Sequence, residues 1–248
     1  MIEQTHPSYP NPTIQEALCE MRFPLGISPF ASQFGLVWDR LRGQFPDLET
    51  FVDVLPPPAP NIAISGPVPT QQRFVMRHST RQFLLQFVPG AFTLNTLVPY
   101  LGWATMYEDI QAAWQVVQEV LVPEQVSSLT LRYINRVPLP QPLTAAHCWL
   151  VAGDYVPLAA VNAVPPFQSR VQTGTGTGNV TTVALAQMGL TNDVNFAMIV
   201  DIERTLTGNF SAETPRIMEQ VDALHTDVWD LFKAVKGPQW NDILEGKP

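Results

Sequence analysis

The chain of 248 residues is 46% hydrophobic and 15% charged, and its formal net charge is -8 at pH 7. This composition excludes a wholly disordered chain, because enough apolar surface is present to form a core. The excess of acidic residues opposes non-specific binding to nucleic acid, which depends on basic side chains.

The sequence predicts a protein of the cytoplasm. Its start lacks a basic segment followed by an apolar one, and no apolar run reaches the length of about eighteen residues that a membrane helix needs. Cys19 and Cys148 are the only cysteines. Two cysteines are too few for a disulfide framework, so we expect buried thiols in a reducing compartment.

The first elements are a strand and a helix. Residues 17–23 alternate between apolar and polar side chains, which predicts a strand with one buried face. Ser28 and Pro29 have the form of a helix cap and first turn, and apolar residues then recur at helical spacing over residues 30–45. A short strand is predicted at residues 51–54.

A meander and a second helix follow a proline-rich loop at residues 55–69. Residues 73–97 predict three strands joined by turns, one of them at Pro89 and Gly90. Thr105 and the glutamate three residues later have capping-box spacing, and an apolar stripe predicts a helix that ends before Pro123.

The second half predicts further strands and a long helix. The strands are expected at residues 127–139, 180–190 and 195–206, while residues 141–166 give no clear pattern. Thr214 is the expected cap of the last long helix, whose apolar residues fall on one face.

These elements predict an α+β fold with helices packed on one face of an antiparallel sheet. The order of strand, helix, strands and helix occurs twice. We therefore expect an N-terminal half (1–124) and a C-terminal half (125–248), which can share one sheet within a single domain.

Three stretches carry a family resemblance: NPTIQEALCEMRFP at 11–24, LRYINRVPLP at 131–140, and MIVDIERT at 198–205 with the later LHTDVWDLFKAV. In this order they resemble a sporadically distributed family of uncharacterised bacterial and archaeal proteins of similar length. The resemblance implies a common fold and the patchy distribution of accessory or antiviral-defence genes. It transfers no catalytic residue, because no reaction is established for that family.

The run TGTGTG at residues 173–178 is the most motif-like segment of the chain. Its glycine spacing fits neither the dinucleotide fingerprint nor the P-loop, no lysine follows, and the next residues predict a strand rather than a helix. Two structural interpretations stay open: a strand with a bare glycine face covered by a neighbour, or a hairpin tip.

Charged side chains recur at alternating positions on three predicted strands, and so share a face on each. The six candidate site residues are Glu20, Arg22, Arg132, Arg136, Asp201 and Glu203. One interpretation is a solvated face with cross-strand ion pairs. The other is a concave face on which the arginines grip a peptide, a nucleic acid or a small anion.

Metal and nucleophile chemistry find little support in the sequence. The four histidines are far apart and fit no metal-binding spacing, and His147 with Cys148 lacks a C-x-x-C motif beside it. We expect no metal, no cofactor and no catalytic residue.

The sequence thus predicts a non-enzymatic binding or assembly module in a homo- or hetero-oligomer, the accessory partner of another protein, with bacterial defence as its setting. The alternative is a ligand- or nucleic-acid-sensing protein that uses the arginine-bearing sheet face. An enzyme of unrecognised type is the third candidate.

Overall fold

A computed structural model describes residues 6, 8–24, 30–54, 70–139, 148–163, 166–187 and 197–247. The expected features at Ser28, Pro29, residues 55–69 and His147 lie outside these residues. In chain order the elements are β1 (Ile14–Arg22), α1 (Phe30–Leu41), β2 (Asp47–Val54), β3 (Thr70–Arg77), β4 (Phe83–Val88), β5 (Ala91–Leu97), α2 (Trp103–Leu121), β6 (Gln125–Pro138), α3 (Leu158–Val161), β7 (Phe167–Gly174), β8 (Val180–Gln187), β9 (Ala197–Ser211), α4 (Thr214–Val235) and α5 (Pro238–Leu244).

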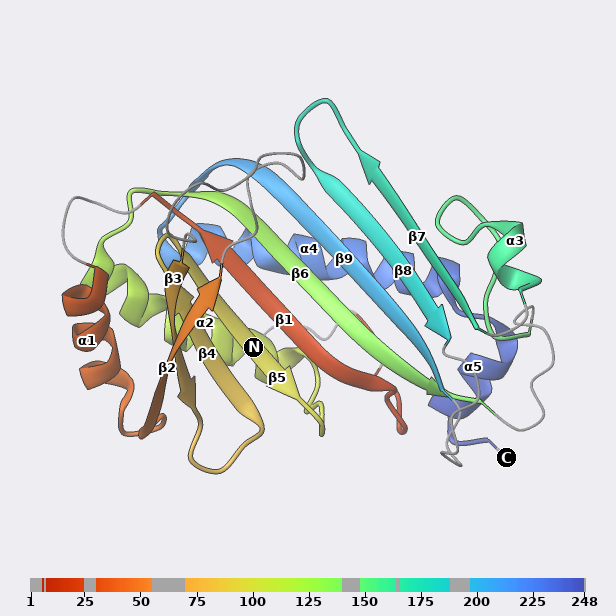
Figure 1. Cartoon of the computed structure of the whole chain (residues 1–248), viewed down its shortest axis with the longest axis horizontal. Coiled ribbons are helices and arrows are strands. Elements are labelled where there is room, and N and C mark those ends of the chain that lie inside the picture. Colours follow the sequence, from red (N-terminus) through yellow and green to blue (C-terminus); the bar gives the residue numbers. More distant parts are fainter. Residues whose placement is uncertain are drawn as a thin grey trace.

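Nine strands of the described chain form one antiparallel sheet in the order β2-β3-β4-β5-β1-β6-β9-β8-β7 (Figure 1). The predicted α+β class is confirmed. Alternation sets the two faces of the sheet: on β6, Leu129 and Leu131 are fully buried, whereas Thr130 and Arg132, which follow them in alternation, are half-buried. The buried set forms one face of the core.

The long helices α2 and α4 cover this buried face and lie behind the sheet in Figure 1. Their apolar stripes follow the predicted spacing, with Ile110 and Val117 buried on α2 and Val221 and Leu224 on α4. Trp114 is fully buried, and its indole N–H donates to the carbonyl of Ala212 at 3.0 Å. This bond satisfies the polar atom of a large core side chain.

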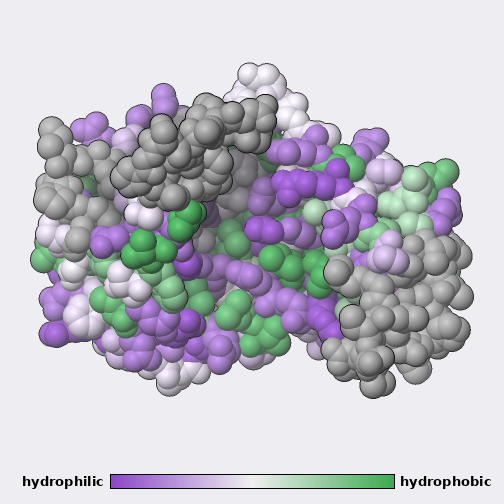
Figure 2. All heavy atoms as spheres, in the orientation of Figure 1, coloured by the Kyte–Doolittle hydropathy of each residue, from purple (hydrophilic) through white to green (hydrophobic). Residues whose placement is uncertain are grey.

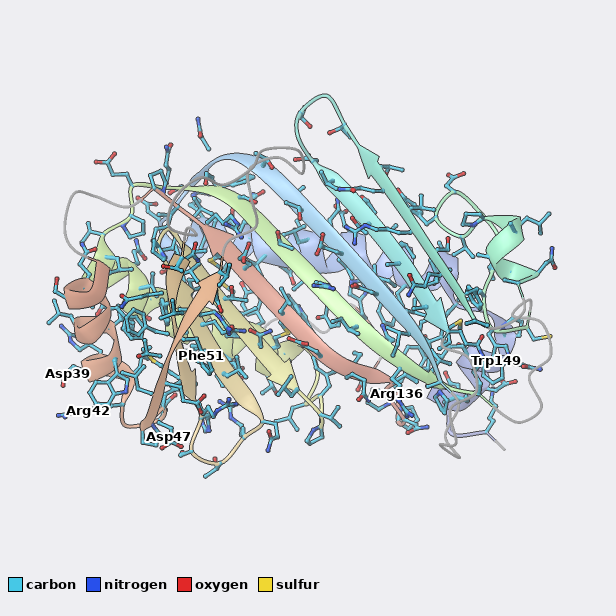
Figure 3. All side chains as sticks on the ribbon, in the orientation of Figure 1. Asp39, Arg42, Asp47, Phe51, Arg136 and Trp149 are labelled. Atoms are coloured by element: carbon cyan, nitrogen blue, oxygen red, sulfur yellow. The ribbon has the colours of Figure 1, made fainter. Side chains whose placement is uncertain are left out.

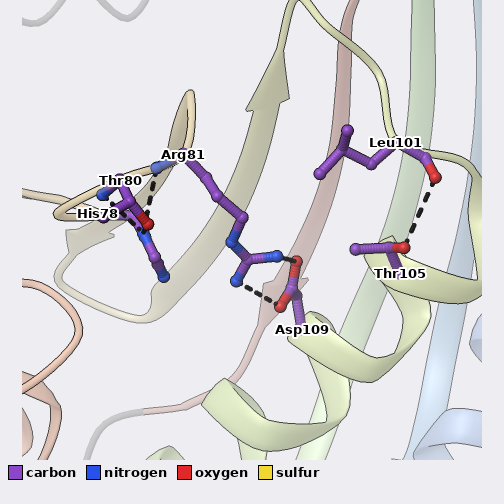
Figure 4. Close-up of polar contacts among 6 residues, drawn as sticks. All are labelled: His78, Thr80, Arg81, Leu101, Thr105 and Asp109. Carbon is purple, nitrogen blue, oxygen red and sulfur yellow. Dashed lines mark hydrogen bonds and ion pairs between the residues drawn. The ribbon is translucent and has the colours of Figure 1, made fainter.

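The strand meander is joined to α2 by an ion pair. Arg81, in the turn between β3 and β4, donates two hydrogen bonds to Asp109 on α2, at 2.7 and 2.8 Å (Figure 4). His78 Nδ1 accepts the backbone N–H groups of Thr80 and Arg81. The turn is therefore stabilised both within itself and against the helix.

The predicted cap of α2 at Thr105 is wrong. The helix begins two residues earlier, and its N-cap is Gly102, which has a φ of 98° and no side-chain cap. The hydroxyl of Thr105 donates back to the carbonyl of Leu101 at 3.5 Å instead (Figure 4). Glycine adopts this positive φ without strain, so the chain turns into the helix there.

Both halves of the chain contribute to the same sheet. Strands β1 to β5 come from residues 1–124 and β6 to β9 from residues 125–248, and β1 and β6 pair at the junction. The connection from β1 to β2 contains the twelve-residue α1, whereas the described part of the connection from β6 to β7 contains the four-residue α3. The repeat of two halves stays a prediction.

Candidate functional site

A polar groove crosses the sheet face opposite α2 and α4. It has a volume of about 630 Å³ and is lined by residues of β3, β4, β5, β1, β6 and β9, which are consecutive in the sheet. Figure 2, which views this face, shows hydrophilic and hydrophobic residues interspersed over it. The charged lining residues are Glu16, Glu20, Arg22, Arg73, Arg132 and Glu203.

Strand pairing brings most of the predicted site residues together. Four of them line the polar groove: Glu20, Arg22, Arg132 and Glu203. Asp201 lies two positions before Glu203 on β9 and bonds to Arg132. Arg136 is at the far end of β6, where its backbone N–H donates to the carbonyl of Thr13, and it is not a lining residue (Figure 3).

Arg132 is held rigidly by two carboxylates of β9. Its guanidinium donates to both oxygens of Asp201, at 2.8 and 2.6 Å, and Glu203 lies 3.8 Å away. The hydrogen bonds to Asp201 raise the pKa of Arg132 above its usual value. A bidentate pair of this kind fixes the plane of the guanidinium.

A chain of hydrogen bonds crosses five neighbouring strands on the same face. Arg73 donates to Asp53 at 2.8 Å and to Gln86 at 2.9 Å. Gln86 donates to Asn95 at 2.8 Å, and Asn95 donates to Glu16. The path runs from β2 through β3, β4 and β5 to β1.

Sequence reasoning did not single out this chain of hydrogen bonds. The alternation of polar and apolar residues in the sequence does indicate that Arg73, Gln86 and Asn95 lie on the polar face of their strands. The sequence does not indicate the order of the strands in the sheet, and these residues are neighbours only because of that order.

Every arginine of the polar groove is bonded to a carboxylate of the same face. The pairs are Arg22 with Glu20 at 2.7 Å, Arg73 with Asp53 at 2.8 Å and Arg132 with Asp201 at 2.6 Å. The groove is therefore balanced in charge, and an anion that bound there would compete with a carboxylate already in place.

An aromatic cavity of about 300 Å³ lies on the other side of the sheet, toward the helices. Its lining includes the core-face residues Tyr133 and Asn135 of β6, together with His225 and Trp229 of α4. This cavity was not predicted from the sequence. The cavity depends on contacts between the two halves of the chain.

The glycine–threonine run forms the tip of the β7–β8 hairpin. Thr175 donates its N–H to the carbonyl of Asn179 at 2.9 Å, and Gly178, with a φ of 83°, donates to the carbonyl of Thr175 at 3.0 Å. The residues from Thr173 to Gly178 are exposed. Of the two open interpretations, the hairpin tip is the one observed.

The two cysteines have different surroundings. Cys19 is fully buried in the core face of β1, and burial raises its pKa to about 12. Cys148 is half-buried, so the expected burial holds fully for Cys19 alone.

No group of three or more His, Cys, Asp and Glu side chains among the described residues is arranged to hold a metal ion. No helix within the described ranges has both the length and the apolar character needed to cross a membrane.

No protein-family model and no curated protein matches the chain. The resemblance to the sporadically distributed family therefore stays a prediction.

Proposed function

We propose that the protein is a non-enzymatic binding module that holds an extended segment of a protein partner in the polar groove. The observation that carries this proposal is the bidentate pairing of Arg132, which lines the groove on β6, with Asp201 of the adjacent strand β9. The pair is formed before a partner arrives, so little side-chain freedom is lost on binding.

The groups along the groove suit a polar peptide segment. Thr93, Thr130 and Thr205 add hydroxyls between the charged residues, and Gln71 adds an amide. Each of these side chains can donate and accept hydrogen bonds. A partner segment with amide and hydroxyl side chains and charges of both signs matches this lining.

The length of the groove fits such a segment. The six lining strands lie side by side, and adjacent strands are about 4.8 Å apart, so the groove spans roughly 24 Å. An extended chain rises about 3.3 Å per residue, so about seven residues cross it.

The balance of charge favours a protein over a nucleic acid. The three lining arginines are matched by three lining glutamates, and Asp53 and Asp201 bond two of those arginines from just beyond. Binding to a phosphate backbone depends on basic groups that replace its counterions. The proposal also includes an accessory role in bacterial defence, for which the family resemblance is the support.

The test begins with a photoreactive residue in place of Ser128, which lines the groove, to capture the partner in cells of the native host. The captured protein is then purified and titrated calorimetrically against the wild type and Arg132→Ala. We expect the variant to bind at least about tenfold more weakly, as is usual when a bonded charge inside an interface is truncated.

Arg216→Ala is the matched control, because Arg216 is an exposed arginine of α4, paired with Glu219 outside the groove. Equal affinity of the wild type and Arg132→Ala overturns the proposal. Binding of an RNA or DNA oligonucleotide that is lost in Arg132→Ala also overturns it, in favour of the nucleic-acid alternative.

A further inference from the structure

The aromatic cavity is separated from the polar groove by the sheet itself. Tyr133, Asn135 and Ile202 form its floor, and all three lie on the core face of their strands. The segment 100–103 and α4 form its walls. The N-terminal part of the chain adds His6, Ser8, Tyr9, Pro10, Pro12, Thr13 and Ile14 to the lining. A ligand bound in this cavity therefore does not touch the polar groove.

No Asp, Glu, Lys or Arg side chain occurs among the described residues that line the cavity. Two charged side chains behind the lining are already bonded to it. Asp222 accepts the indole N–H of Trp103 at 3.1 Å, and Lys236 donates to the hydroxyl of Tyr9 and to Asn241. A charged ligand would lose its hydration here without gaining an opposite charge, which costs several kcal/mol.

Flat aromatic surfaces dominate the walls. Trp103 stacks on His225, with ring centroids 3.9 Å apart and planes 2° from parallel. His6 stacks on Trp229 with centroids 5.0 Å apart, and Tyr9 lies against the same indole at 5.9 Å. Rings held in this way present faces and edges to a further ring, which favours a planar aromatic ligand.

The hydroxyls of Tyr100 and Tyr133 and the ring of His225 are uncharged polar groups that the cavity offers. The hydroxyls of Tyr100 and Tyr133 lie 3.1 Å apart, and burial raises the pKa of Tyr100 to about 12 and holds that of Tyr133 well above its usual value. Burial and nearby His6 lower the pKa of His225 to about 3, so its ring is neutral at pH 7.

The ring of His225 can also form hydrogen bonds with a ligand. It is 8% exposed, and its ring nitrogens have no hydrogen-bond partner among the described residues. A neutral imidazole has one donor and one acceptor nitrogen. A ligand with a hydroxyl or a ring nitrogen can therefore bond to His225 or to the tyrosine pair.

We propose that the aromatic cavity binds an uncharged, planar aromatic molecule of one or two rings that carries a hydroxyl group or a ring nitrogen. The volume of about 300 Å³ is at the small end of ligand pockets. It is about twice the ~150 Å³ of an apolar cavity that accepts benzene, which sets the limit of two rings.

Three probes that share a naphthalene ring test the charge requirement: 2-naphthol, 2-naphthoate and 2-naphthylmethylammonium, each titrated calorimetrically into the full chain at pH 7. We expect 2-naphthol to bind, and the anion and the cation to bind at least about tenfold more weakly. Absence of 2-naphthol binding, or equal binding of either charged probe, overturns the proposal.

The place of binding is read from the indole N–H resonances of the tryptophans. We expect 2-naphthol to shift the signals of Trp103 and Trp229, which line the cavity, and to leave those of Trp38 and Trp149, which do not. Shifts confined to Trp38 or Trp149 contradict the assignment. This measurement needs no variant and stands even if a cavity variant fails to fold.

Val228→Phe fills the cavity from α4, and Ala223→Phe adds the same ring to the exposed side of that helix as a control. We expect Val228→Phe to abolish 2-naphthol binding and Ala223→Phe to retain it, with the fold of both checked by circular dichroism. Undiminished binding to folded Val228→Phe overturns the proposal.

Discussion

Arg132 pairs diagonally with Asp201 rather than with its direct neighbour across the strands. Its partner in the β6–β9 register is Glu203, yet the nearest approach to Glu203 is 3.8 Å, whereas Asp201 accepts two hydrogen bonds. Asp201 is also the less exposed carboxylate, at 14% against 27%. The diagonal contact is therefore the stronger of the two.

We expect Asp201→Asn to lower the free energy of unfolding by about 1 kcal/mol, because charge-assisted hydrogen bonds stabilise a fold more than exposed ion pairs do. Glu203→Gln should cost only a few tenths of a kcal/mol. Urea denaturation of both variants measures the difference. An equal loss of unfolding free energy in the two variants would show that the contact with Asp201 stabilises the fold no more than the contact with Glu203.

Gly237→Ala should destabilise the fold by about 2 kcal/mol. A Cβ at Gly237 would lie 2.6 Å from the carbonyl carbon of Trp149 and 2.8 Å from the carbonyl oxygen of Cys148, and backbone atoms cannot move aside alone. Gly176→Ala is the control, since no atom lies within 4 Å of its Cβ position. Thermal unfolding compares the two, and similar melting temperatures would contradict the steric argument.

His225 should make the protein less stable in mild acid. Its pKa is lowered to about 3 in the folded chain, against about 6.5 when unfolded. Above pH 6.5 both states are neutral. Below pH 6.5 the side chain of residue 225 is protonated in the unfolded chain but stays neutral in the folded chain. The free energy of unfolding therefore falls by up to about 1.4 kcal/mol per pH unit.

The comparison of wild type with His225→Gln between pH 7 and pH 5 isolates this effect. The pKa of His78 is also lowered by burial and adds a slope of the same sign, which both proteins retain. We expect the variant to lose stability less steeply. Identical slopes in the two urea titrations would mean that His225 takes up its proton in the folded chain.

The thiols should differ in reactivity. The thiolate is the reactive form, and burial with a pKa near 12 keeps Cys19 protonated and out of reach. We expect iodoacetamide to label the half-buried Cys148 in the native protein and to label Cys19 only after denaturation. Mass spectrometry of the peptides decides this, and early labelling of Cys19 would contradict the burial.

Local patterns predicted the elements that have one buried face, whereas β7, which has no buried residue, was not predicted. The strand β1 and the apolar stripe of α4 could be predicted from the sequence for this reason. The start of α2 was misplaced since a cap of the right spacing, Thr105, competes with a glycine of permissive backbone at Gly102.

The arrangement in space could not be predicted from those patterns. Arg73 and Glu16 are joined through Gln86 and Asn95 only because β3, β4, β5 and β1 are consecutive in the sheet. Likewise, the stacking of Trp103 on His225 joins residues far apart in sequence. Periodicity indicates which face of a strand or helix a residue occupies, but it does not indicate which residues of other elements lie next to it.

The position of β1 between β5 and β6 has a consequence for synthesis of the chain. Leu18 pairs with Asn95 on one side and with Arg132 on the other, so both partners emerge from the ribosome long after it. Such distant pairings slow folding. Until β6 is made, the future centre of the sheet is an unpaired edge, open to chaperones and to strands of neighbouring nascent chains.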